Sequence, residues 1–326
     1  MKILGIGNAL VDLLVRLPNE ELLSELKLKK GSMELINKEF IGDVINKTYH
    51  LEKKQVSGGS AANTIYGVAS LGGSAGFIGT IGNDNFGSVF TENLKESNII
   101  PYLFISDAET GVVGSLITPD SERTMTTFLG AAGNISTSQI NSTLLKQYQL
   151  IHVEGYLVFN RELIEFTAKL AKECGLKVSL DLASYNVVEA NVDFLKNMIK
   201  NYIDIVFANE DEAKALTGKQ PEEALDEIAK MAEIAVVKVG KNGSMVKSGQ
   251  QKYIIGATPA NVIDTTGAGD LYAGGFLYAL SKGFSLDKCG KIGALLAGKV
   301  IEQIGAKIPA TIWPGILENV SKIELE

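Results

Sequence analysis

The chain has 326 residues, of which 45% are hydrophobic and 21% charged, and this composition excludes disordered and fibrous proteins. Its 31 lysines and arginines and 38 aspartates and glutamates give a net charge of -7. That balance disfavours nucleic acid and anionic membranes as partners, because both attract broad basic surfaces. We therefore expect a small-molecule substrate, bound by one large domain with an appendage or by two domains.

The few cysteines and histidines exclude several kinds of site. Cys174 and Cys289 are far apart and predict neither a disulfide scaffold nor a zinc site, which fits a reducing, cytoplasmic compartment. Two histidines, His50 and His152, disfavour multi-histidine metal sites and Ser-His-Asp catalysis. We expect His152 to be a buried, hydrogen-bonded imidazole in a strand. No apolar run reaches the ~18 residues of a membrane span, and Asn8 and Asp12 interrupt the apolar start, which we interpret as a strand.

Short β-branched runs alternate with amphipathic stretches along most of the chain. The strand-like runs are 3–6, 75–78, 150–153, 178–181, 205–208 and 235–239. The helical stretches are 61–71, 86–96, 163–173, 210–216, 222–231, 269–280 and 286–304. This alternation predicts an α/β fold, namely a doubly wound, mostly parallel sheet flanked by helices.

Two regions, 12–51 and 101–128, break that alternation. The second contains three strand-like pieces without a helix between them, at 102–105, 112–118 and 124–128. We expect both regions to form a small antiparallel sheet that acts as a lid. The remaining residues, 1–11, 52–100 and 129–326, then form the large α/β domain.

The segment 264–270, DTTGAGD, directly precedes an apolar helix. Small residues at a helix start leave the N–H groups of Gly267, Ala268 and Gly269 free to bind an anion, which the helix dipole also favours. Asp270 beside that anion would repel a phosphate, unless it accepts the proton of the group that attacks the phosphate. The alternative is a glycine turn in which Asp270 caps the helix.

Two further loops contain small and polar residues. Ser57–Asn63 opens a helix, and its glycines allow a polyol ligand to approach the backbone beside Asn63. The alternative is tight packing of that helix on the sheet. Residues 5–12 resemble a dinucleotide fingerprint, but Leu10 occupies the third glycine position, so Asn8 and Asp12 are better interpreted as ligands of paired hydroxyls at a strand end. The chain contains no P-loop sequence.

These loops together resemble the ribokinase-like (PfkB) family of sugar and nucleoside kinases. GGSAANTIYGVASLGG, from Gly58, resembles the first signature of the family, and DTTGAGDLYAGGFL, from Asp264, resembles the second. The resemblance extends from about residue 2 to 309. It includes FANEDEAKAL, VVKVGKNGSMV and AGKVIEQIGAKIP.

The resemblance implies a role for each matching residue. Asp270 is the catalytic base, and Gly267, Ala268 and Gly269 form the anion hole. The acceptor is held by Asn8, Asp12, Gly58, Gly59 and Asn63.

The resemblance also implies the ATP side of the site. Asn209 and Glu212 lie near phosphate and Mg²⁺-bound water, although the residues alone indicate only an acidic helix start. Lys238, Gly240 and Gly243 lie where the family binds the ATP ribose and adenine, and alone they indicate a β-turn. Asp264 and the backbone at Thr266 correspond to a monovalent-cation (K⁺) site in several relatives.

Arg123 lies inside the predicted lid, in SERTMTTF. Closure of the lid brings its guanidinium onto the transferred phosphate, as the adenosine kinase-like members imply, while the alternative is a solvated hairpin residue. The loop 82–87 lacks the ligand spacing of a calcium site, so we expect a turn that caps the next helix.

The acceptor is predicted from differences within the family. Ser60 stands where ribokinases have a lysine, whereas Ser57–Ser60 and Gly5–Asn8 match the adenosine kinase-like members. The first hypothesis is therefore transfer of the γ-phosphate of ATP to the primary hydroxyl of a nucleoside. A kinase for ribose, fructose or a ketodeoxy sugar is the alternative, since Ala61–Ala62 also occurs in sugar kinases.

Two other classes of function stay open. One is a nucleotide or sugar sensor without turnover, which the intact Asp270 disfavours, and the other is an NAD-dependent dehydrogenase, which Leu10 disfavours. The chain is expected to be a monomer or a homodimer, because an exposed lid edge offers a strand for pairing.

Overall fold

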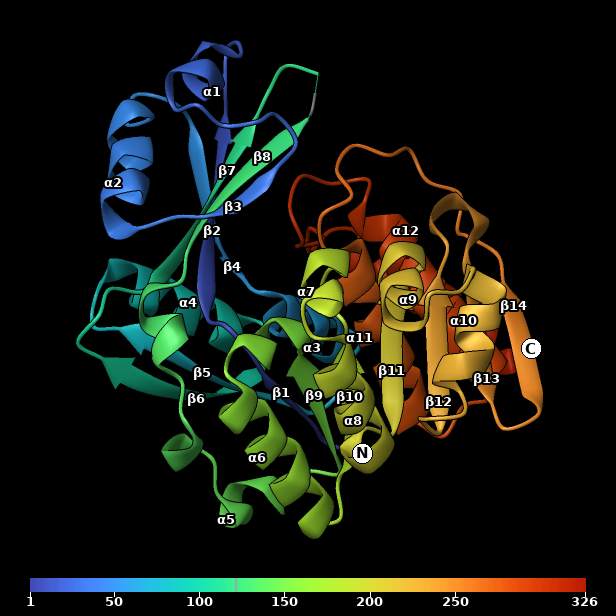
Figure 1. Cartoon of the computed structure of the whole chain (residues 1–326). Coiled ribbons are helices and arrows are strands. Elements are labelled where there is room, and N and C mark those ends of the chain that lie inside the picture. The colour runs from blue at the N-terminus through green and yellow to red at the C-terminus, as the bar shows by residue number, and fades with distance from the viewer. Residues whose placement is uncertain (121) are drawn as a thin grey trace.

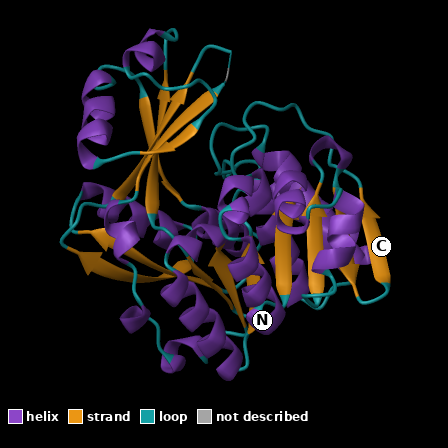
Figure 2. Ribbon diagram, viewed as in Figure 1, coloured by secondary structure: helices purple, strands orange, loops and turns teal. Residues whose placement is uncertain are grey.

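The computed structural model describes residues 1–120 and 122–326, whose strands form two sheets (Figures 1 and 2). Neighbouring strands of the large sheet pair in parallel, except at one edge, where β13 and β14 pair antiparallel. In spatial order the strands are β14 (Gln251–Ile255), β13 (Ser244–Ser248), β12 (Ile234–Lys238), β11 (Ile205–Asn209), β10 (Lys177–Asp181), β9 (Leu150–Glu154), β1 (Ile3–Ile6), β5 (Ala75–Gly82) and β6 (Ile99–Ser106). The predicted fold class is confirmed.

Helices cover both faces of the large sheet, because its central strands are apolar on both faces. Ile3 packs into a core on one face, and Leu4 and Ile6 pack into a second core on the other. The first face carries α3 (Ser60–Ser70), α4 (Asn85–Glu96), α11 (Ala268–Ser281), α12 (Leu286–Val300) and α13 (Trp313–Leu325). The second carries α6 (Arg161–Glu173), α8 (Val192–Tyr202), α9 (Glu210–Thr217) and α10 (Pro221–Ile228).

Short helices complete the large unit. They are α5 (Ser142–Leu145), α7 (Tyr185–Glu189), and the 3-10 turns η1 (Gly130–Asn134), η2 (Thr137–Gln139), η3 (Gly155–Phe159) and η4 (Gly240–Asn242). The turn before α4 has the expected form, since the Asp84 carboxylate accepts the Gly87 N–H at 2.8 Å and caps that helix.

The small sheet stands above one end of the large sheet in Figure 1. Its strands, in spatial order, are β3 (Met33–Leu35), β8 (Arg123–Phe128), β7 (Gly111–Ile117), β2 (Leu10–Arg16) and β4 (Lys53–Gly58). Helices α1 (Glu21–Glu25) and α2 (Lys38–Lys47) pack on one face through an apolar core. We call this sheet, together with α1 and α2, the lid.

The lid differs from the prediction in its strands. Residues 102–105, predicted in the lid, lie in β6 and pair in parallel with β5 of the large sheet. The helix α4 between β5 and β6 permits that parallel pairing. The lid instead includes β4, and its sheet is mixed, because β2–β7 and β3–β8 pair in parallel.

Glycines bring α3 and α11 into close contact. A Cβ atom on Gly274 would lie 2.6 Å from the carbonyl oxygen of Thr64 and 3.1 Å from the Cα of Gly67. The two backbones touch at this point because neither glycine carries a side chain. The contact sets the distance between the amino-terminal ends of the two helices.

We predict opposite effects for two glycine-to-alanine changes in helices. Gly274→Ala lowers the free energy of unfolding by about 1–3 kcal/mol, because its methyl group overlaps the Thr64 carbonyl oxygen. Gly42→Ala in α2 raises it by about 0.5–1 kcal/mol, because nothing lies within 4 Å of the added methyl and alanine favours a helix. Urea unfolding measures both, and a Gly274→Ala protein as stable as the wild type contradicts the close packing.

Candidate active site

A cavity of about 1350 Å³ lies between the lid and the carboxyl ends of the central strands. It exceeds the roughly 300–1,000 Å³ of most small-molecule pockets, so it has room for two ligands. Most of the predicted site residues line it, whereas Gly58 and Asp264 do not, although their chain neighbours Gly59 and Thr265 do. Those that line it are Asn8, Asp12, Gly59, Asn63, Arg123, Asn209, Glu212, Lys238, Gly240, Gly243, Thr266, Gly267, Ala268, Gly269 and Asp270.

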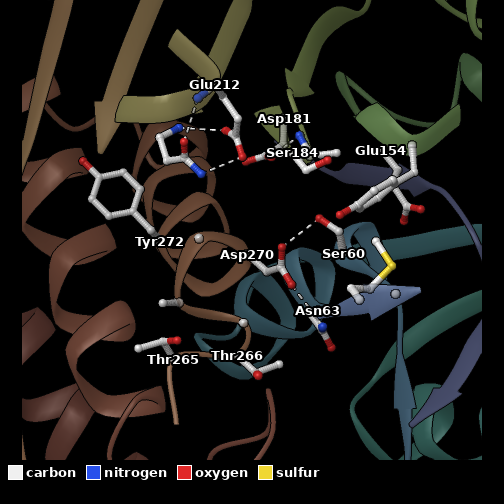
Figure 3. A pocket seen from close by; sticks show the side chains of 18 of the residues that line it. Ser60, Asn63, Glu154, Asp181, Ser184, Glu212, Thr265, Thr266, Asp270 and Tyr272 are labelled. Atoms are coloured by element: carbon white, nitrogen blue, oxygen red, sulfur yellow. Dashed lines mark hydrogen bonds between the residues drawn. The ribbon is translucent and has the colours of Figure 1, made fainter. Parts of the chain in front are cut away.

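Asp270 lies in the first turn of α11 and joins it to α3. Its two carboxylate oxygens accept hydrogen bonds from the Ser60 hydroxyl at 2.7 Å and the Asn63 amide at 3.1 Å (Figure 3). Burial raises the pKa of Asp270 to about 6, although these two donors favour the charged form. The two glycine-rich loops therefore meet at one carboxylate, which is close to the range of a general base at neutral pH.

The predicted anion hole occupies the start of α11. Gly267 adopts a positive φ of 75°, and a Cβ there would lie 2.5 Å from the Cβ of Ala306. The Ala268 N–H already donates to the Thr265 carbonyl at 3.2 Å, whereas Gly269 and Asp270 lie in the first turn, where helical N–H groups have no intrahelical partner. An anion at this end is stabilised by these groups and by the helix dipole.

The predicted acceptor side is formed by polar groups after β1, near the start of β2 and at the end of β9. The Asn8 amide donates to Glu154 at 2.5 Å, and the second oxygen of Glu154 accepts the Ala61 N–H at 3.1 Å. A Cβ on Gly58 would lie 2.6 Å from the Asp12 carboxylate. Gly59 has a φ of 90°, and a Cβ there would lie 2.2 Å from the Asn8 carbonyl oxygen, so only glycine fits.

Glu154 was missed by the sequence analysis. It is 1% exposed, and burial raises its pKa to about 7 even though Asn8 and Ala61 donate to it. The only sequence signal is an acidic residue at the end of a buried strand, LIHVE. An acidic residue in that position indicates a site residue only when the strand is known to end at the ligand-binding edge of the sheet.

The ATP side, as implied by the resemblance, lies at the ends of β11 and β12. Asn209 and Glu212 form a capping box at the start of α9, in which each side chain accepts the other residue's N–H, at 2.8 and 2.7 Å. Burial and the neighbouring Asp181 raise the pKa of Glu212. Gly240 and Gly243 have φ values of 54° and 90° in the turn after β12, which explains why both are glycines.

Lys238, at the end of β12, forms an ion pair with Asp181 at the end of β10, with 3.0 Å between Nζ and Oδ2. Asp181 is the second residue that the sequence analysis missed. Burial raises its pKa, but Lys238 and the Ala183 N–H outweigh this and lower the pKa below its ordinary value. The side chains of both residues are largely buried.

Arg123 reaches from the lid to the loop before α11. Its guanidinium pairs with Asp264 at 3.2 Å and also donates to the hydroxyls of Thr266 and Ser115. Asp264 additionally accepts the N–H groups of Thr266 and Gly305, at 2.9 and 2.8 Å. Burial opposes the charged form, yet Gly305 and Arg123 hold the pKa of Asp264 below its ordinary value. Arg123 therefore fastens the lid to the large unit and is not a solvated hairpin residue.

His152 is only partly as expected. Its ring is fully buried and Nδ1 lies 2.6 Å from the Ser179 hydroxyl, but Nε2 has no hydrogen-bond partner among the described residues. Burial lowers its pKa to about 4, so the ring is neutral at pH 7. Because the neutral ring carries no charge, it needs no ion-pair partner, although its Nε2 atom lacks a hydrogen bond.

Two searches of the described residues bear on membranes and metals. No helix in residues 1–120 or 122–326 is long and apolar enough to cross a membrane. No three His, Cys, Asp or Glu side chains within these ranges cluster in a way that holds a metal ion.

Comparison with known proteins identifies the family. Residues 37–313 match the pfkB family carbohydrate kinases. The chain belongs to the PfkB family. Its members are ATP-dependent kinases that act on hydroxyl groups, and this PfkB kinase is therefore such an enzyme.

Individual relatives of this PfkB kinase differ in their named substrates. A probable sugar kinase from Rhizobium etli has 33% identity and a TM-score of 0.90, covering 100% of this chain and 99% of its own. The adenosine kinase from Sinorhizobium meliloti has 32% identity and a TM-score of 0.88, and the match covers 98% of this chain and 99% of that kinase. A nucleoside kinase from Methanocaldococcus jannaschii is 29% identical over 81% of this chain and 85% of its own.

We predict that the Arg123–Asp264 pair holds the lid of this PfkB kinase in place. Arg123→Met speeds amide hydrogen exchange in β7 and β8, because the lid loses a contact whose side chains are 8% and 10% exposed. The control is Lys38→Met, which removes an exposed pair with Glu109 (61% and 55% exposed) and leaves exchange unchanged. Equal exchange in the wild type and the Arg123→Met variant contradicts this role.

Proposed function

We propose that this PfkB kinase transfers the γ-phosphate of ATP to the primary hydroxyl of a nucleoside, with Asp270 as the base. The observation that supports this choice is an apolar wall beside the acceptor groups Asn8, Asp12 and Glu154. A ribose needs the polar groups, whereas a flat nucleobase gains from burial against apolar side chains. The wall consists of Leu10, Val113, Met125, Leu129, Ala132, Ile135, Leu157 and Phe159.

Phe159 strengthens the case for a nucleobase. Its side chain lines the cavity and is 65% exposed, at the end of η3. An exposed aromatic ring that lines a cavity is suited to stacking on a planar ligand. Relatives named adenosine kinase and nucleoside kinase agree with this choice.

A sugar kinase is the second candidate. The buried Glu154 with Asn8 and Asp12 forms a polar set that also suits a compact polyol, and a probable sugar kinase is among the similar structures. The two candidates differ in whether the apolar wall is covered by the acceptor.

The proposed mechanism follows from the pKa values. The pKa of Asp270 is about 6, while a hydroxyl similar to that of water has a pKa near ~16. Asp270 therefore orients the hydroxyl and accepts its proton only as the bond to phosphorus forms. The loose transition state of phosphoryl transfer permits this late transfer. The charge on the moving group is stabilised by the N–H groups at the start of α11.

ATP is proposed to bring Mg²⁺, which neutralises the phosphate charge when bound. Mg²⁺ keeps most of its waters and uses few carboxylates, and both carboxylate oxygens of Glu212 already accept hydrogen bonds from Asn209. Glu212 thus fits contact through water. The predicted roles of Asp12, Gly58 and Asn63 toward the acceptor, and of Asn209, Gly240 and Gly243 toward ATP, are part of the same proposal.

A screen of ATP consumption tests the acceptor. Adenosine and other nucleosides are expected to give a kcat/KM at least ten times that of ribose, fructose or ketodeoxy sugars, because only nucleosides cover the apolar wall. Phe159→Ala is expected to raise KM for the nucleoside and leave KM for ATP unchanged. Each assay is run with and without K⁺, because the resemblance to the family implies a monovalent-cation site at Asp264 and Thr266. A sugar preferred over every nucleoside contradicts the proposal.

The role of Asp270 is tested by Asp270→Asn. We expect turnover to fall by about 10²–10⁴ with ATP binding largely intact, because the general base is lost. In the wild type, kcat/KM is expected to fall as the pH drops through about 6, where the carboxylate becomes protonated. The control is Asp287→Asn, in the first turn of α12, which leaves turnover unchanged. Near-normal turnover in a folded Asp270→Asn protein contradicts the role.

A further inference from the structure

The ammonium of Lys238 lies at the start of α11. A Cβ built on Gly269 would be only 2.9 Å from its Nζ, so the missing side chain of Gly269 provides the space that the ammonium occupies. Lys238 is the last residue of β12, and its side chain reaches past β11 to Asp181 at the end of β10. The charge is thus held where the helix dipole and free N–H groups favour an anion.

Asp181 holds the ammonium without using all of its hydrogens. The Oδ2 atom of Asp181 accepts one N–H of Lys238 at 3.0 Å, and Oδ1 accepts the Ala183 N–H at 2.9 Å. An ammonium has three N–H donors, and Asp181 is the one hydrogen-bond acceptor that the described residues offer it. Two donors of Lys238 therefore remain for a ligand.

The surrounding charge also points to an anionic ligand. Three carboxylates, on Asp181, Glu212 and Asp270, act on the Lys238 ammonium and raise its pKa against the effect of burial. The oxygens of Glu212 and Asp270 accept hydrogen bonds from Asn209, Ser60 and Asn63. Lys238 therefore provides a positive charge that offsets part of this negative charge.

The other cations of the cavity wall are less suited to this task. Within the described residues, three basic side chains line the cavity, on Arg123, Lys238 and Lys241. The Arg123 guanidinium is engaged by Asp264, Thr266 and Ser115, and Lys241 is exposed in the turn after β12.

We propose that Lys238 binds the phosphoryl group that is transferred, rather than the ATP ribose, and that Asp181 is its positioning residue. The inference deepens the proposed function and rests on phosphoryl transfer at the start of α11. In the free protein Asp181 holds the ammonium over Gly269. When ATP binds, the two remaining N–H groups donate to oxygens of the terminal phosphate, and the link to Asp181 keeps the ammonium in place.

Nucleotide binding measured by calorimetry without an acceptor tests this role. Lys238→Met is expected to weaken binding of a non-hydrolysable ATP analogue by at least tenfold, as for the loss of a charged hydrogen bond, and to leave ADP binding within threefold. Lys172→Met, which removes a pair with Asp204 away from the residues that line the cavity, is the matched control and leaves both within threefold. An equal loss for the analogue and for ADP places Lys238 on the ribose or the first phosphates and overturns the proposal.

A double variant separates this role from a structural one. Lys238→Met leaves Asp181 buried without its partner, whereas Lys238→Met with Asp181→Asn removes both charges and serves if the single variant does not fold. The proposal expects the double variant to keep the selective loss for the ATP analogue. Recovery of wild-type affinity for the analogue shows that the pair is only structural and overturns the proposal.

Asp181→Asn alone tests the positioning residue. Analogue binding is expected to weaken less than in Lys238→Met, because the ammonium is retained, while kcat falls at least tenfold, because a neutral amide holds the ammonium over Gly269 less firmly than the carboxylate does. An unchanged kcat contradicts the role of Asp181. Because binding is measured without an acceptor, a protein that binds the analogue through Lys238 and phosphorylates only sugars refutes the nucleoside proposal alone.

Discussion

The contact between Asp270 and the start of α3 determines the geometry of the whole site. Ser60 and Asn63, at the start of α3, donate to the two carboxylate oxygens of Asp270. They precede Asp270 in the sequence by 210 and 207 residues. This contact is possible only because α3 and α11 touch through Gly67 and Gly274. Close packing thus brings two helix amino termini, one carboxylate and the ends of the central strands to the same place.

Burial at that place sets the electrostatics. It raises the pKa of Asp270 to about 6 and that of Glu154 to about 7, because desolvation disfavours the charged form of both carboxylates. Two cations of the cavity wall, Arg123 and Lys238, are each held by an aspartate. The site therefore contains its charges in fixed positions before a ligand arrives, which is the arrangement that stabilises charge in a transition state.

Local sequence patterns were sufficient to predict the layers of the fold and the two glycine-rich loops of the site. Apolar runs on both faces identified the central strands, and glycine-rich helix starts identified the loops at Ser57–Asn63 and Asp264–Asp270. The strand β6 was misassigned because no helix separates it from β7 in the chain, although it pairs with β5 of the large sheet. Pairing partners depend on the whole chain, and no local pattern reveals them.

The residues missed by the sequence analysis were single charges without a motif. Glu154 and Asp181 each end a buried strand, and their meaning depends on the neighbours that the sheet order provides. The partner of Arg123 was also hidden, since Asp264 lies 141 positions away. Long-range ion pairs of this kind follow from topology and are not visible in spacing.

The most direct test of the account is a crystal structure of the protein with a non-hydrolysable ATP analogue, Mg²⁺ and adenosine. The account predicts the terminal phosphate at the N–H groups that begin α11, with an adenosine hydroxyl in hydrogen-bond contact with Asp270. Phosphates bound elsewhere in the cavity, with Asp270 directed toward solvent, would contradict it.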